Sequence, residues 1–235
     1  MLDAILNLLF PQSCVLCGIQ VFERRWSAAC PECWSKLEPI PRPFCLQCGM
    51  PAAAIETVCG ACRRGDHAFD FARSLFLFND PMRGIIHHLK YSARVSLAKP
   101  LGQLLRDCVT QAGFEAKIAL PVPLHRSRAR ERGFNQAEII AAAVSRSTGI
   151  TVDKLSLARK VHTPMHRTGM DQKARELTIH NAFEVTRPRL IAGKAVVLVD
   201  DVLTSGATAS QAARTLKKNG ATRVNVFTLA RAVMH

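Results

Sequence analysis

Apolar positions after residue 70 alternate between a strand pattern and an amphipathic helix pattern. Buried strands are predicted at 72–78, 117–120, 193–199 and 223–229. Helices are predicted at 82–91, 97–112, 134–147 and 207–218, where apolar residues recur at helical spacing. Strands separated by helices predict an α/β fold with a mostly parallel sheet flanked by helices. In such a sheet, ligands bind at the carboxyl ends of the strands.

Cysteines dominate the segment before residue 63, which holds eight of the nine in the chain. They form four C-x2-C pairs: Cys14 and Cys17, Cys30 and Cys33, Cys45 and Cys48, and Cys59 and Cys62. Two thiolates at this spacing reach one Zn²⁺, and two pairs complete a tetrahedral site without an open position. Structural zinc is favoured over a disulfide framework because no secretory signal precedes the pairs.

The spacing of the pairs repeats along the chain. The first and third pairs are 31 residues apart, and the second and fourth are 29 residues apart. This repeat favours two successive sites over an interleaved arrangement. The predicted ligand sets are Cys14, Cys17, Cys30 and Cys33, and then Cys45, Cys48, Cys59 and Cys62. The sequence thus predicts a small double zinc-ribbon module over 1–64, a linker near 63–70 and an α/β domain over 70–235. The ninth cysteine, Cys108, is expected to be a small buried hydrophobic residue.

The first ten residues are mostly apolar but contain Asp3, with neither a basic segment nor a small-residue cleavage site. They are therefore unlike a signal peptide. No run in the chain reaches the roughly 18 to 20 apolar residues that cross a bilayer. We expect a short amphipathic N-terminal helix, no transmembrane segment and a cytoplasmic location.

The formal net charge is +14. Such a charge concentrates phosphates and nucleic acids around a protein, so a polyanionic partner or substrate is expected. A solvated basic face is the plain alternative. Aromatic residues make up only 6% of the chain, too few to identify a platform on which bases stack.

The third predicted strand leads directly into the chain's most informative segment. The aliphatic run 196–199 is followed by Asp200 and Asp201, and two adjacent acids at a strand end need partners that ribose hydroxyls and a divalent cation supply. The next residues, 204–208, are small and rich in hydroxyls at a helix start, where a phosphate binds to backbone amides. A helix cap at Thr204 or Ser205 is the alternative, but it leaves the two acids unexplained. Neither a Walker A pattern nor a G-x-G-x-x-G turn occurs.

This order of residues resembles the signature with which type I phosphoribosyltransferases bind phosphoribosyl pyrophosphate (PRPP). The resemblance implies that the 5′-phosphate is held by Thr204, Ser205, Gly206, Ala207 and Thr208. It also implies that Asp200 and Asp201, the candidate catalytic residues, hold the ribose hydroxyls while Mg²⁺ bridges ribose and pyrophosphate. Catalysis in such a site consists of positioning and charge stabilisation as pyrophosphate leaves.

Three segments, taken with the predicted ribbons, resemble the ComF/GntX family of competence-type, phosphoribosyltransferase-like proteins. They are MRGIIHHLKYSAR at 82–94, PVPLHRSRARERGFNQA at 121–137 and the PRPP segment. The resemblance implies contacts to pyrophosphate or DNA from His125, Arg126, Arg128 and Arg132, with Asn135 and Gln136 nearby. Lys90 is a further candidate for phosphate contact. The guanidinium group of arginine can donate two parallel hydrogen bonds to phosphate oxygens. The alternative is that these residues form a solvated basic loop.

The family pattern also includes a hood between 157 and 183, in which Arg, Thr and Gln precede an Arg with Asn three residues later. Four positions match this pattern: Arg159, Thr163, Arg175 and Phe183. His166 or Arg167 stands where Gln is common, and Thr178 stands where Asn is common. These departures leave the acceptor base undefined.

Three functions fit these observations. The first is transfer of a phosphoribosyl group to or from a nucleobase. The second is binding of single-stranded DNA as an accessory factor in DNA uptake, with uptake-machinery proteins as partners. The third is a regulator that binds PRPP or a nucleotide without turnover, because a fold does not fix an activity. The oligomeric state is left open.

Overall fold

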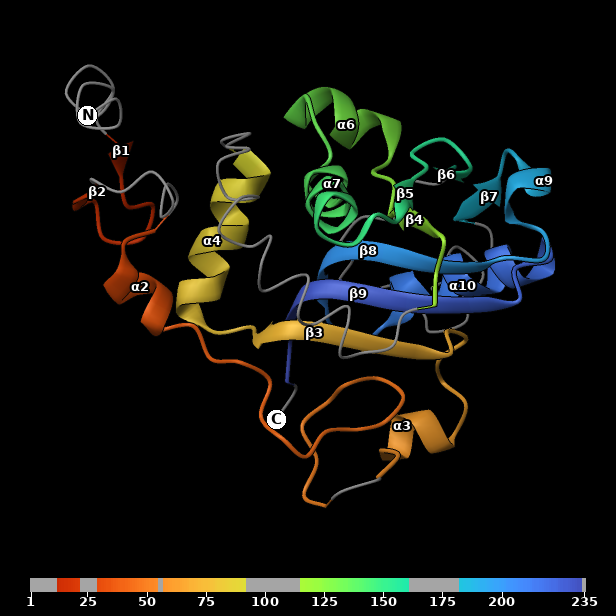
Figure 1. Ribbon diagram of the computed structural model, residues 1–235, viewed down its shortest axis with the longest axis horizontal. Helices are drawn as coiled ribbons and strands as arrows, with labels where there is room; N and C mark the ends of the chain where they lie inside the picture. The colour runs from red at the N-terminus through yellow and green to blue at the C-terminus, as the bar shows by residue number, and fades with distance from the viewer. Residues whose placement is uncertain (1–11, 22–28, 55–56, 92–114, 161–181, 234–235) are drawn as a thin grey trace, which may run out of the picture.

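The computed structural model describes residues 12–21, 29–54, 57–91, 115–160 and 182–233 (Figure 1). The predicted N-terminal helix, the predicted helix at 97–112 and Cys108 lie outside these residues. Within the described part, no helix combines the length and apolar character needed to cross a membrane.

A five-stranded sheet forms the centre of the protein, and all its neighbouring strands run parallel. Its strand order is β3 (Phe71–Leu77), β9 (Arg223–Arg231), β8 (Ala195–Leu203), β4 (Ile118–Pro121) and β5 (Thr151–Val152). A second, antiparallel pair consists of β6 (Leu157–Arg159) and β7 (Phe183–Val185). The four strands predicted from the sequence therefore all belong to the parallel sheet, as expected.

Helices cover both faces of this sheet. Their bounds are α4 (Asp80–Tyr91), α6 (Arg126–Arg132), α7 (Gln136–Thr148), α9 (Pro188–Ile191) and α10 (Ala207–Lys218). In β8, Val197 and Val199 share a core with α4 and α7, which lie above the sheet in Figure 1. Val196 and Leu198 share the other core with α10. Because alternate residues of a strand point to opposite faces, the aliphatic run buries β8 on both sides.

Two local predictions need correction. The strand predicted to end at residue 199 continues to Leu203, since β9 still pairs with it, Asp200 lying opposite Thr228. On its other side, β4 pairs with β8 only as far as Val199. The two acids thus lie inside β8 where one neighbouring strand has already ended. The segment considered as a basic loop forms the short helix α6, which ends at Gly133 in the left-handed conformation.

The first ribbon packs against α4. It contains β1 (Gln12–Ser13), β2 (Gln20–Val21) and α2 (Pro31–Ser35). Its residues Cys14, Cys30, Cys33 and Trp34 share a core with Met82, Ile85 and Leu89 of α4. The approach is close at Gly84, where an added Cβ would lie 2.3 Å from Leu16 Cδ2.

The second ribbon packs against β3 and includes α3 (Gly60–Arg63). The amide of Ala72 donates to the Gln47 carbonyl at 2.6 Å, and Cys45, Cys48 and Cys62 belong to the same core as α10. The predicted linker 63–70 is itself packed, because Phe69 is buried and the Asp70 amide donates to the Val224 carbonyl at 2.8 Å.

Candidate functional site

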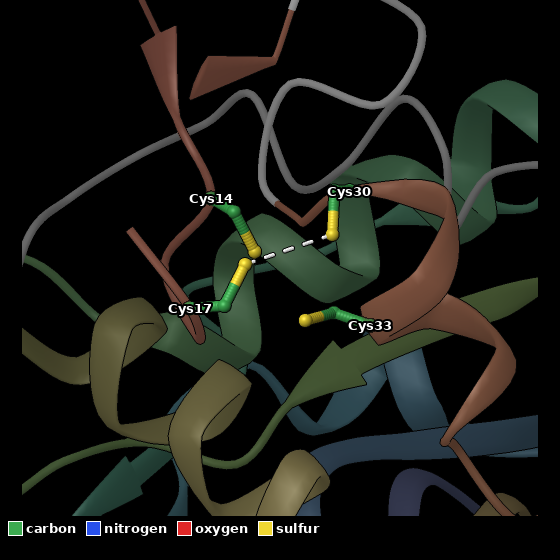
Figure 2. Close-up of side chains that lie close together, drawn as sticks. All are labelled: Cys14, Cys17, Cys30 and Cys33. Carbon is green, nitrogen blue, oxygen red and sulfur yellow. Dashed lines mark hydrogen bonds between the residues drawn. The ribbon is translucent and has the colours of Figure 1, made fainter. Parts of the chain in front are cut away.

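The first four cysteines turn their sulfur atoms toward a common space (Figure 2). These atoms, from Cys14, Cys17, Cys30 and Cys33, all lie within 4.8 Å of one another. The sulfurs of Cys17 and Cys30 are 3.7 Å apart. A tetrahedral site with Zn–S bonds of about 2.3 Å has sulfur–sulfur edges of about 3.8 Å, so this set fits zinc.

The second set repeats this geometry in a more buried place. Its four sulfurs also lie within 4.8 Å of one another, with Cys45 3.7 Å from Cys62 and Cys48 3.6 Å from Cys59. Cys45 and Cys48 are almost completely buried, whereas Cys17 of the first set is exposed. The predicted pairing of cysteines into two successive sets is confirmed.

The same turn presents the first two sulfurs of each set. The amide of Gly18 donates to the Cys14 carbonyl at 2.9 Å, and the amide of Gly49 donates to the Cys45 carbonyl at 3.0 Å. Gly18 and Gly49 have φ values of 76° and 67°, a region that side chains with a Cβ rarely adopt. A glycine after the second cysteine of each set therefore allows the turn that brings two sulfurs of that set together.

The acids of β8 lie at the carboxyl end of the sheet, where the ligand was expected. Asp201 is buried, and its Oδ2 atom forms an ion pair with Lys90 Nζ at 2.8 Å. The same oxygen accepts a hydrogen bond from Gln136 Nε2 at 3.3 Å. Lys90 and Gln136, predicted as phosphate contacts, are thus gathered around an acid that was predicted to hold ribose.

Asp200 lies in an environment that disfavours its charged form. Burial and, after it, the Asp201 charge raise the pKa of Asp200 to about 8, although Lys90 and Arg159 act in the opposite direction. Its Oδ1 atom accepts a hydrogen bond from the Asp201 amide at 2.9 Å. A divalent cation would favour the ionised form, so the site is electrostatically suited to one.

Residues 204–206 join β8 to α10, and residues 207 and 208 begin the helix. Gly206 occupies the cap position of α10 with a φ of 79°, and no side chain caps the helix. Ser205 Oγ accepts only a long hydrogen bond from the Ala207 amide, at 3.4 Å. Thr204, Ser205 and Thr208 are exposed. The first amides of α10, which have no partner within a helix, therefore face an exposed, hydroxyl-rich segment.

The residues predicted to contact pyrophosphate or DNA fall into two groups. His125 caps α6 by accepting from the Ser127 amide at 3.3 Å, and Asn135 caps α7 by accepting from the Ala137 amide at 3.1 Å. Arg132 instead donates to Gln136 Oε1 at 3.4 Å, which links it to the acids of β8. The structure therefore gives helix-end roles to two of the predicted contacts.

The two remaining arginines both lie on α6. Arg126 is exposed. Arg128 lies close enough to Arg159 for its charge to contribute, after burial, to lowering the pKa of Arg159. With Lys90 and Arg132, Arg128 is thus the third predicted basic residue that reaches the neighbourhood of the acids.

Comparison with known proteins identifies relatives of both the cysteine-rich part and the α/β part of the chain. A double zinc ribbon domain model matches residues 5–63, and a phosphoribosyl transferase domain model matches residues 131–233. The DNA utilization protein YhgH of Escherichia coli K12 is 30% identical over 226 residues, which cover 94% of this chain and 97% of that protein. This chain belongs to the ComF/GntX family. Competence protein F of Haemophilus influenzae is 28% identical over 209 residues, covering 86% and 90% of the two chains.

One solved structure is also similar to this ComF chain. It is the glutamine PRPP amidotransferase from B. subtilis complexed with ADP and GMP, with a TM-score of 0.41 and 23% identity. The match covers 59% of this chain and 29% of that one.

Three residues that contact the site were not selected from the sequence. Arg159 was matched to the ComF hood pattern without a role; its guanidinium lies 5.5 Å from the centre of the Phe183 ring, and its Nε is buried with no partner among the described residues. Residues 204–208, called the phosphate segment below, are contacted by Arg231 of β9 and lie next to His67 of the predicted linker. No local pattern marks either residue, because both contacts are made far along the chain. The hood positions Thr163, His166, Arg167, Arg175 and Thr178 lie outside the described residues.

Proposed function

We propose that this ComF-family chain binds PRPP or a related ribose 5-phosphate together with Mg²⁺ at the carboxyl end of β8. The observation that carries the proposal is the juxtaposition of two acids, Asp200 and Asp201, with a helix that starts six residues after Asp201, at Ala207, and has a glycine at its cap position. Phosphate suits the amides and dipole of α10, while a cation and ribose hydroxyls suit the acids.

The surrounding cations support this assignment. Lys90 pairs with Asp201, and Arg132 reaches it through Gln136. Arg159 lies near Asp200, and Arg128 lies near Arg159. A pyrophosphate leaving a ribose held by the acids would enter this group of positive charges, which is where charge stabilisation would act. The reaction we propose is phosphoribosyl transfer to or from a nitrogen base.

Turnover separates an enzyme from a protein that only senses PRPP. Purified protein is incubated with PRPP, Mg²⁺ and a panel of bases while released pyrophosphate is measured. Release above that of an Asp200→Asn, Asp201→Asn control supports transfer. Binding of PRPP without any release would leave the regulator as the function.

The second candidate function is binding of single-stranded DNA. Relatives are named for DNA utilization and competence, and this chain carries a net charge of +14. Two basic surfaces favour the idea: exposed arginines on α6, and a cavity of about 710 Å³ near β5 whose cationic lining is Lys117, Lys154, Arg187 and Lys194.

Salt dependence tests this candidate. Because phosphate contacts release counterions, affinity for an oligonucleotide should fall steeply as salt rises, and charge reversal at Lys117 and Lys194 or at Arg126 and Arg130 should reduce it. Each pair of substitutions identifies which basic surface is used. Binding that is absent, or insensitive to salt, would exclude the DNA function.

A cytoplasmic location is part of the proposal, because reduced thiols are required for the zinc sites.

A further inference from the structure

Arg231, the last residue of β9, connects the second set of cysteines to the phosphate segment. Its side chain is buried, with 3% of its surface exposed. Nη1 donates to the carbonyl oxygen of Leu203 at 2.8 Å and also to that of Thr204, while Nη2 lies 3.9 Å from Cys48 Sγ. One guanidinium thus contacts a predicted zinc ligand and the first residue of the phosphate segment.

The charge of this guanidinium needs a partner in the protein interior. Among the described residues, no carboxylate lies within ion-pair distance of Arg231. The four-cysteine set would supply this negative charge when it holds zinc, because a zinc ion with four thiolates carries two net negative charges. A neutral polar side chain could donate hydrogen bonds to the two carbonyl oxygens equally well. The positive charge at this position is therefore explained by the metal site and not by the carbonyls.

A second contact reaches the phosphate segment from the chain that follows the second ribbon. A Cβ added at Gly206 would lie 2.8 Å from His67 Cε1, and the His67 ring stacks on Phe69 with centroids 4.8 Å apart. The amide of Ala68 donates to Ser210 Oγ, in the first turn of α10, at 2.8 Å. The chain that follows the second ribbon therefore lies against the phosphate segment at Gly206 and against α10 at Ser210, while Arg231 of β9 joins Cys48 to Thr204.

We propose that the second zinc site and the phosphate segment are energetically coupled, with Arg231 as the positioning residue. Zinc at Cys45, Cys48, Cys59 and Cys62 fixes Arg231, and Arg231 fixes the Thr204 carbonyl and the loop that follows it. In the described part of the chain, no hydrogen bond links the first set of cysteines to the phosphate segment, and this set packs against α4. Coupling between two sites is reciprocal, so a phosphate ligand must strengthen zinc binding by the factor by which zinc strengthens phosphate binding. We expect the stronger zinc binding to appear as slower zinc release. The inference rests on the proposed phosphate site.

The test measures both directions on the full zinc-loaded chain. Ribose 5-phosphate affinity is measured by calorimetry, and zinc release to a coloured chelator is followed with and without saturating ribose 5-phosphate. We expect the ligand to slow release of one of the two zinc ions by about five- to tenfold, within the usual range of coupling, and to leave the other unchanged. In Cys17→Ser, which retains only the second site, the protected zinc should remain.

Arg231→Lys tests the role of the planar guanidinium group, because a lysine ammonium keeps the positive charge but cannot reproduce the arrangement of the two Nη donors. We expect about tenfold weaker ribose 5-phosphate binding and less than about twofold protection of zinc. The matched control is Arg223→Lys at the exposed start of the same strand, which should behave as wild type.

The outcomes are distinct. If the wild type binds ribose 5-phosphate but both zinc ions leave at unchanged rates, the coupling is wrong and the proposed function stands. If the wild type binds no ribose 5-phosphate, calorimetry alone shows that both are wrong. Because these results come from the wild type, they hold even if Arg231→Lys does not fold.

Discussion

Lys90 Nζ and Asp201 Oδ2 lie 2.8 Å apart, and this ion pair joins α4 to the carboxyl end of β8. The first ribbon packs on the same helix, through Met82, Ile85 and Leu89. The second ribbon contacts the phosphate segment through Arg231. Each zinc ribbon therefore supports a different half of one site, the acids on one side and the phosphate segment on the other.

Removing the partner of Asp201 should destabilise the protein. Lys90→Met leaves a buried carboxylate with Gln136 as its remaining side-chain partner, and we expect a loss of about 2 kcal/mol in the free energy of unfolding, less than for a fully buried pair because Lys90 is partly exposed. Denaturant unfolding measures this change. Lys36→Met, which breaks the exposed pair with Glu32, is the control and should leave the midpoint unchanged. Equal effects of the two substitutions would contradict the account.

The raised pKa of Asp200, about 8, predicts how binding depends on pH. Below pH 8 the carboxyl is protonated and attracts a cation weakly, so the affinity for PRPP with Mg²⁺ should rise about tenfold per pH unit from pH 6 to 7 and level off above 8. Titration calorimetry across this range checks the slope. Asp200→Asn should bind weakly at every pH, and a wild-type affinity independent of pH would show that Asp200 does not titrate with binding.

The same group predicts the opposite trend for stability without ligand. Its pKa in the folded protein lies above the unfolded value of 3.8, so from about pH 4 to 8 the unfolded chain ionises while the folded chain stays protonated. The contribution of Asp200 to folding stability therefore falls as pH rises through this window. Asp200→Asn should be less sensitive to pH than wild type in thermal unfolding, and identical profiles would contradict this reasoning.

The two ribbons predict two zinc ions per chain, measured by native mass spectrometry. Cys33→Ser and Cys62→Ser should each lose one ion, because each removes one ligand from a different set. Cys108→Ser is the control, since Cys108 belongs to neither set, and it should keep both. A chain in which one substitution removes both ions would indicate that the sites share ligands.

Gly206 tests the fit of the phosphate segment against His67. Gly206→Ala meets both an unfavourable φ of 79° and the His67 ring, whereas Gly149→Ala meets a similar φ of 77° with open space around it. Both should destabilise by about 1 kcal/mol from backbone strain, and Gly206→Ala by more. Only Gly206→Ala should weaken ribose 5-phosphate binding, and His67→Ala added to it should restore part of the loss. Similar effects of the two alanines on binding would exclude the contact with His67 as a constraint.

Local patterns predicted the interiors of the elements and the metal sets. The aliphatic run 196–199 identified β8, and the repeated spacing of cysteines identified which pairs come together in one set. The end of β8 was misplaced because its pairing with β9 beyond Val199 depends on the tertiary arrangement of the strands. The charged run of α6 has no apolar face to mark it as a helix.

The supporting residues behind the site could not be predicted from local sequence. Arg231 contacts Cys48 across 183 positions of the chain, and Ala68 contacts Ser210 across 142. Such contacts are fixed by how the second ribbon packs on the sheet, which no periodicity describes. The charge of Lys90 made it a candidate for phosphate contact in the sequence. Its ion pair with Asp201 could be seen only in the folded structure, because α4 and β8 are far apart along the chain.

The central claim is that the segment between β8 and α10 binds the 5-phosphate of a phosphoribosyl ligand. Calorimetric titration of the zinc-loaded protein with ribose 5-phosphate, and separately with ribose, tests it most directly. We predict saturable binding of one ribose 5-phosphate per chain, no detectable binding of ribose at the same concentrations, and a loss of at least tenfold in affinity in Gly206→Ala. Equal binding of the two sugars, or none of either, would contradict the claim.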